Sequence, residues 1–222
     1  MLNSNIEQFN LPPVNRKELL RYASIKGALD ETTAALLEEC LAEATDLLFG
    51  KVCYQVLPTK DLLQLLPSAQ QSSDFTRYLR GCDYVVAFVA TVGITIDRLV
   101  ARYATVSTSK AFIFQALGAE RIECLCDLFS QKTADFVAEK GMSVKPRFSP
   151  GYGDFSLNVQ RELFALLTPE TSVGVTLTTN MMMSPTKSVS ALIGIGKDVK
   201  GGASCETCTQ KQCIYQRNEY EH

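Results

Sequence analysis

The chain has 222 residues, of which 46% are hydrophobic, and its 24 acidic and 22 basic side chains leave a formal net charge of −2. Such a composition is typical of a globular protein with a sizeable core, and it provides no basic surface of the kind that binds nucleic acid. No apolar stretch approaches the length of a membrane span, and the first ten residues lack the pattern of a signal peptide. We therefore expect a cytoplasmic protein whose partners include neither nucleic acid nor a membrane.

The only histidine is His222, the last residue of the sequence. Hydrolases with a Ser-His-Asp triad, Cys-His proteases and the usual zinc hydrolases all need an internal histidine, so these classes are excluded. In a reducing compartment the eight cysteines are expected to be thiols or metal ligands and not disulfides.

Helical and strand patterns alternate in the first two thirds of the chain, and strand patterns cluster in the last third. The consecutive apolar residues from Tyr84 to Val92 predict a central strand that is buried on both faces, and the longest helical pattern runs from Ser107 to Lys140, with a break expected near Gly118. The fold class expected is α+β, with a mixed, largely antiparallel twisted sheet and long helices. Residues 1–15 are polar and are expected to form an arm or docking segment before a first helix that begins near residue 16. The other helices are expected over 31–48, 61–66, 73–80, 94–103 and 157–167, and the other strands over 52–57, 142–145, 173–178 and 188–195.

Three cysteines near the C-terminus, Cys205, Cys208 and Cys213, form a C-x2-C-x4-C pattern directly after Gly201-Gly202. The short spacing allows three thiolates to surround one metal, as in a zinc site or an iron–sulfur cluster, and a fourth ligand would come from elsewhere. A tail whose thiols cluster without function is the alternative. For the other five cysteines, packing in the core is the better interpretation.

The stretch Arg147-Phe148-Ser149-Pro150-Gly151-Tyr152 combines an arginine, a turn and an aromatic ring. A guanidinium can bind a carboxylate through two hydrogen bonds, and glycine lets backbone amides approach a bound group. These residues predict a cradle for a small ligand that carries a carboxylate and a flat ring. A solvated surface turn is the alternative that these residues leave open.

The C-terminal half resembles the activation domain of cobalamin-dependent methionine synthase, whose pattern is Arg-x-x-Pro-Gly-Tyr, a helix, a Leu-Thr strand, a loop with one proline and a Ser-Val-Ser strand. The matching residues, in the same order and at similar spacing, are Arg147, Pro150-Gly151-Tyr152, Leu177-Thr178, Pro185 and Ser188-Val189-Ser190.

The resemblance implies a protein that binds S-adenosylmethionine and aids the reductive methylation of a cobalamin or corrinoid methyltransferase, with that methyltransferase and an electron donor as partners. By the same resemblance Arg147 would hold the methionine carboxylate, and Ser149, Pro150, Gly151 and Tyr152 would seat the adenosine. Catalysis by this chain itself stays open.

The sequence also departs from the family. Ser156 stands where the family continues to a further proline, and Glu120, Glu123 and Asp127 lie near the family's acidic position on the long helix without matching its register. We expect an N-terminal segment over 1–80, an activation-domain-like region over 81–200 and a cysteine-rich tail over 201–222, acting in trans on a separate corrinoid protein. A non-catalytic docking module and a small iron–sulfur or zinc redox protein are the alternatives.

Overall fold

The computed structural model describes residues 4–44, 49–197 and 199. Its centre is a five-stranded sheet with the strand order β1-β2-β3-β7-β4, in which every described pairing is antiparallel. This architecture confirms the expected α+β class. The strands are β1 (Asn5–Phe9), β2 (Gly50–Pro58), β3 (Tyr84–Thr91), β4 (Ser143–Val144) and β7 (Ser188–Gly196), and a separate hairpin joins β5 (Thr176–Leu177) to β6 (Met183–Ser184).

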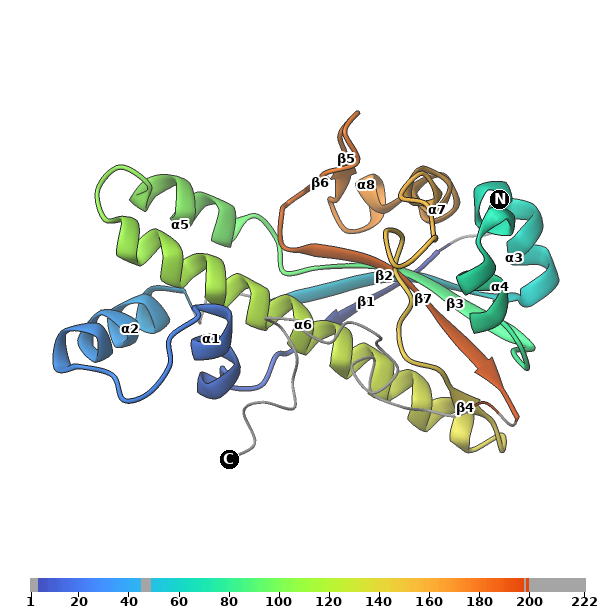
Figure 1. The fold of residues 1–222 in the computed structure, drawn as a ribbon, viewed down its shortest axis with the longest axis horizontal. Helices are drawn as coiled ribbons and strands as arrows, with labels where there is room; N and C mark the ends of the chain where they lie inside the picture. Colours follow the sequence, from blue (N-terminus) through green and yellow to red (C-terminus); the bar gives the residue numbers. More distant parts are fainter. Residues whose placement is uncertain (1–3, 45–48, 198, 200–222) are drawn as a thin grey trace.

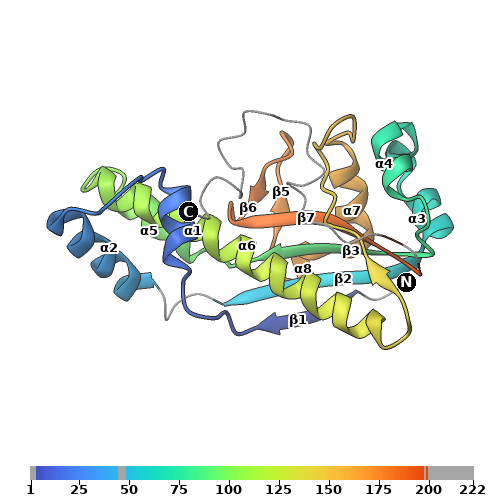
Figure 2. The same cartoon turned by 60° about the horizontal axis from the view of Figure 1, so that its bottom comes forward.

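Helices cover both faces of the sheet, which explains why β3 is apolar along almost its whole length (Figures 1 and 2). On one face, alternate residues such as Val85, Ala87 and Leu192 pack against the short helices; on the other, Phe88 and Ile193 pack against the longest helix. The first group of helices is α3 (Thr59–Leu65), η2 (Pro67–Gln71), α4 (Ser73–Tyr78), α7 (Val159–Leu167) and α8 (Pro169–Ser172); the longest helix is α6 (Thr108–Ala138).

A third hydrophobic cluster lies beyond one end of the sheet, where α1 (Arg16–Tyr22), α2 (Glu31–Ala44) and α5 (Thr95–Tyr103) gather around the N-terminal half of α6 (Figure 1). The side chain of Asn15 caps α1 by accepting from the amides of Lys17 and Glu18. Because α6 contacts both this cluster and the sheet, it connects the two parts of the core.

Three expectations need correction. Residues 5–9, which were expected to belong to an arm or docking segment without secondary structure of its own, form the strand β1 and pair with β2; the five residues are too few and too polar for a strand periodicity to stand out. The strand expected over 173–178 is reduced to Thr176–Leu177 and joins the small hairpin instead of the sheet. The long helix continues through Gly118 without a break. A Cβ at this position would collide with the side chains of Ile96 and Lys187, so close packing, and not flexibility, is the reason for a glycine here.

The boundaries expected at residues 80 and 200 stay predictions. In the structure β2, from the first expected segment, pairs along its length with β3 from the second.

Candidate functional site

The turn that contains Arg147 lies at the edge of the sheet beside β7. Phe148 exchanges both backbone hydrogen bonds with Leu192, each 2.9 Å long. The chain then reverses, with the amide of Tyr152 donating to the carbonyl of Ser149 at 3.1 Å, and Gly151 takes a φ of +95° that favours glycine. Buried Phe155, stacked on Phe75 with ring centroids 4.4 Å apart, anchors the far end of the turn.

Arg147 extends from this turn to the long helix. Its Nη2 lies 2.8 Å from Oε2 of Glu123 and 3.1 Å from Oδ1 of Asp127, which are four residues apart on α6 and therefore on the same face. Only 20% of the arginine side chain is exposed. Burial alone would lower the pKa of Arg147, but Cys126, Glu123 and Asp127 together raise it above its ordinary value, so the guanidinium stays charged.

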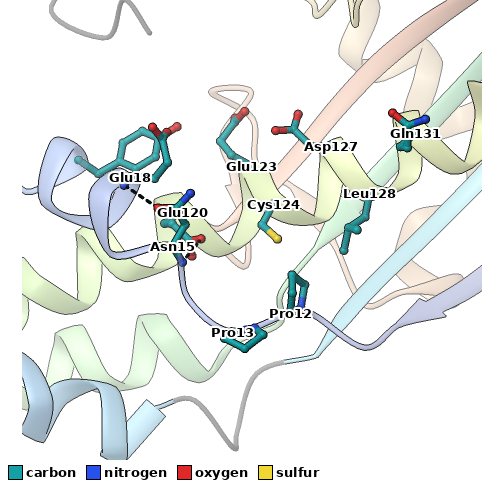
Figure 3. A pocket seen from close by; sticks show the side chains of 11 residues that line it. Pro12, Pro13, Asn15, Glu18, Glu120, Glu123, Cys124, Asp127, Leu128 and Gln131 are labelled. Atoms are coloured by element: carbon teal, nitrogen blue, oxygen red, sulfur yellow. Dashed lines mark hydrogen bonds between the residues drawn. The ribbon is translucent and has the colours of Figure 1, made fainter. Parts of the chain in front are cut away.

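Glu123 and Asp127 also line a cavity of about 620 Å³ between α6 and the segment that leads into α1. Figure 3 shows these two carboxylates side by side on one side of α6, while Cys124 points toward Pro12 and Pro13 on the other. The cavity therefore has an acidic wall. Its full lining is Pro12, Pro13, Asn15, Glu18, Tyr22, Glu120, Glu123, Cys124, Asp127, Leu128 and Gln131.

A buried ion pair holds the N-terminal wall of this cavity in place. Glu120 and Arg121 each expose 3% of their side chains, and Nη2 of Arg121 lies 2.6 Å from Oε1 of Glu120. Arg121 also donates to the carbonyls of Pro12 and Pro13, and Glu120 accepts from the amide of Asn15 at 3.1 Å. Sequence analysis missed this contact, because nothing in the local pattern joins residues more than one hundred positions apart.

The predicted ligand residues are placed together, but none of them lines the cavity. Arg147 meets the cavity through Glu123 and Asp127, whereas Ser149, Pro150 and Gly151 form the backbone of the turn. The ring of Tyr152 is 52% exposed and stands edge-on to Phe148, with centroids 5.9 Å apart. Their roles in ligand binding stay predictions.

The predicted metal ligands Cys205, Cys208 and Cys213 lie outside the described residues. Within the part of the chain that the structure describes, no group of three histidine, cysteine or acidic side chains could hold a metal ion. Of the five cysteines there, Cys40, Cys53 and Cys126 are buried, and burial raises the pKa of the Cys126 thiol to about 12. These three belong to the core, as expected.

The fold and the site define a class: an antiparallel sheet crossed by one long helix, with an arginine turn at the sheet edge facing acidic residues of that helix. The particular family follows from comparison. The family model described as "Vitamin B12 dependent methionine synthase, activation domain" matches residues 66–217. The chain belongs to this family.

Among solved structures, the chain is similar to one described as "Crystal Structure of the MetH Reactivation Domain bound to AdoHcy", with a TM-score of 0.61 and 14% sequence identity. The similarity covers 90% of this chain and 81% of that one, and it establishes the shared fold. No curated protein matches the chain. None of the helices within the described residues combines the length and apolar character needed to cross a bilayer.

Proposed function

We propose that this protein binds S-adenosylmethionine and assists the reductive reactivation of a corrinoid methyltransferase, acting in trans in the cytoplasm. Membership of the activation-domain family supports this proposal. So does the similarity in fold to a reactivation domain described with AdoHcy, the product that remains when S-adenosylmethionine gives up its methyl group.

The observation that carries the proposal is the contact of Arg147 with Glu123 and Asp127. The amino-acid end of S-adenosylmethionine has a carboxylate and an ammonium group on the same carbon, and it needs opposite charges side by side. The hydrogen bonds to Glu123 and Asp127 both start from Nη2 of Arg147, Cys126 also interacts with the same guanidinium, and a guanidinium has five N–H donors in all. Arg147 would bind the carboxylate through the remaining donors, while Glu123 and Asp127 would accept from the ammonium.

Beyond binding the ligand, the proposed reaction requires few functional groups from this chain. The inactive cob(II) centre of the partner gains one electron from a donor protein and the methyl group of the sulfonium as CH₃⁺, which yields methyl-cob(III) and leaves AdoHcy as a neutral thioether. No proton is transferred in this overall reaction. The chain's own residues would hold the sulfonium in position against the partner and exclude water, a role that needs no histidine.

Calorimetric titration with S-adenosylmethionine tests the proposal. We expect Arg147→Ala to weaken binding by about 2 kcal/mol or more, roughly 30-fold, because a charge-assisted pair is lost. Arg77→Ala is the matched control, since Arg77 is paired with Asp74 on the surface. Equal losses in both variants, or none in Arg147→Ala, would remove Arg147 from the site. Absence of binding to the wild-type protein by either S-adenosylmethionine or AdoHcy would overturn the ligand proposal.

We also propose that Cys205, Cys208 and Cys213 hold zinc or an iron–sulfur cluster that serves the electron transfer, on the strength of their C-x2-C-x4-C spacing. A brown colour after anaerobic purification would favour a cluster, and stoichiometric zinc in a colourless protein would favour zinc. If the ligand titration fails, the non-catalytic docking module becomes the leading alternative.

A further inference from the structure

The metal site proposed for the C-terminal cysteines lacks a fourth ligand. A structural zinc ion and an iron–sulfur cluster are each normally held by four protein ligands, and the C-x2-C-x4-C pattern supplies three. The single histidine of the sequence is its last residue, so a further thiolate is the natural candidate. Five cysteines belong to the described part of the chain, and burial and position distinguish among them: Cys40, Cys53, Cys82, Cys124 and Cys126.

Burial excludes three of these five cysteines. Cys40, Cys53 and Cys126 each have an exposed fraction of 0%, and each belongs to a different one of the three hydrophobic clusters. A metal ion could reach them only if a close-packed core opened. Cys82 and Cys124 are partly exposed and remain as candidates.

Cys124 lies far from the end of β7, where the described chain ends. At this end Gly196 pairs with Ser143, and the neighbouring amide of Met142 donates to the carbonyl of Val137 at 3.1 Å, close to the C-terminal end of α6. Cys124 precedes Val137 by thirteen residues on the same helix, which corresponds to about 20 Å along the helix axis. Its side chain also points into the cavity beside α1 (Figure 3).

Cys82, in contrast, lies next to the last described residue, Val199. A Cβ built on Gly196 or on Gly81 would lie 3.0 Å or 3.6 Å from Cγ1 of Val199, so this side chain packs on both glycines. Gly81 directly precedes Cys82 in the sequence. Cys205 follows Val199 by six residues, which can span up to about 20 Å, and it can therefore reach Cys82 without any change in the folded body.

The surroundings of the Cys82 thiol suit a site with several negative ligands. Its Sγ lies over the backbone of β7, since a Cβ on Gly194 would be 2.6 Å from it. The ammonium group of Lys145 is fixed nearby, because it donates to the carbonyls of Tyr78 at 2.6 Å and of Arg80 at 2.7 Å. Burial raises the pKa of the Cys82 thiol, and the charge of Lys145 acts in the opposite direction. A zinc ion with four thiolates has a net charge of about −2, which a fixed cation beside it stabilises.

We propose that Cys82 is the fourth thiolate ligand of a tetrahedral site that binds Zn²⁺ or an iron–sulfur cluster together with Cys205, Cys208 and Cys213. This inference rests on the metal site proposed above for those three cysteines. It also gives the site a place in the fold. Gly194 is two residues from Leu192, which pairs with Phe148 of the arginine turn, so the metal would lie within about 7 Å of this turn along β7, near the ligand to which the proposed reaction supplies an electron.

Alkylation of the wild-type protein tests the assignment without any substitution. The reduced full-length chain is treated with iodoacetamide with and without Zn²⁺, and the modified cysteines are identified by mass spectrometry. We expect Zn²⁺ to protect Cys82 together with the three tail cysteines. Cys124 is the internal control, because it is partly exposed and should react equally under both conditions.

A second measurement uses Co²⁺ as a spectroscopic probe of the number of thiolates. Cys82→Ser should lose about a quarter of the thiolate-to-cobalt charge-transfer absorption, because one of four sulfur ligands is removed. It should also weaken Zn²⁺ binding by about tenfold or more. Cys124→Ser is the matched control and should retain the full absorption and stay within about threefold of the wild-type affinity.

Two results would overturn the inference: protection of the three tail cysteines while Cys82 still reacts, or equal losses in Cys82→Ser and Cys124→Ser. In the first case the metal site of the tail stands and only the assignment of its fourth ligand falls. If the wild-type protein binds neither Zn²⁺ nor Co²⁺, the proposed metal site and this inference fall together. The alkylation experiment decides the question even if Cys82→Ser does not fold.

Discussion

The buried pair of Glu120 and Arg121 offers a sharp test of how the N-terminal wall of the cavity is held. Glu120→Ala removes the only carboxylate that contacts Arg121 in the described structure and leaves a guanidinium that is 3% exposed with the carbonyls of Pro12 and Pro13. Breaking one partner of a buried pair costs about 3–5 kcal/mol, because the other charge remains buried. With a urea dependence of about 2 kcal/mol per M, the unfolding midpoint should fall by about 2 M.

Urea unfolding followed by circular dichroism measures this change. The matched control is Glu38→Ala, which breaks an ion pair with Arg16 whose side chains are more than half exposed; such a pair contributes at most about 1 kcal/mol. The double variant Glu120→Met/Arg121→Met removes both charges and should be more stable than Glu120→Ala alone. A loss below about 1 kcal/mol in Glu120→Ala would refute the view that this pair is desolvated and holds the wall.

Three further outcomes are expected. Gly196→Ala should destabilise the protein by about 1–3 kcal/mol, measured by thermal unfolding, because its Cβ would collide with the backbone carbonyl of Gly81, which cannot move aside as a side chain can. Hydrogen bonds from Ser72 and Ser73 lower the pKa of Asp154 below its usual 3.8, so the stability it adds is present above about pH 4 and is lost as the pH falls toward the lowered pKa. Asp154→Asn should therefore melt below wild type at pH 7, and the difference should shrink at pH 3; a constant difference would contradict this. Cys208→Ser should abolish metal retention, measured by elemental analysis, without changing the melting temperature of the folded body, and an unchanged metal content would disprove the site.

Local patterns predicted most of the long elements because each satisfies one rule throughout. The apolar run from Tyr84 shows no alternation with polar residues, which is typical of a strand whose two faces are both covered. In the structure this run forms β3, which is buried along almost its whole length. The long helix was expected from its periodicity, with a break at Gly118 that does not occur. A glycine's helix propensity is a weak signal, and the close approach of Ile96 and Lys187 could not be read from the chain.

The candidate site was also predicted only in part from the sequence. The Arg-x-x-Pro-Gly-Tyr motif marked the turn and its guanidinium from residue types alone, since both are local features. The acidic partners of this guanidinium are Glu123 and Asp127. Sequence analysis named them together with Glu120 near the family's acidic position, but nothing local showed which of the three would meet Arg147.

By itself the sequence determined the α+β class, the positions of the central strands and the family to which the chain belongs, because hydrophobic periodicity and ordered motifs are properties of neighbouring residues. Only the tertiary structure decided that β1 joins the sheet, that Arg147 contacts the long helix, and that Arg121, paired with Glu120, donates hydrogen bonds to the carbonyls of Pro12 and Pro13. Those contacts join residues that are 20 to more than 100 positions apart. They depend on the angle at which the long helix crosses the sheet, and a local sequence pattern does not determine this angle.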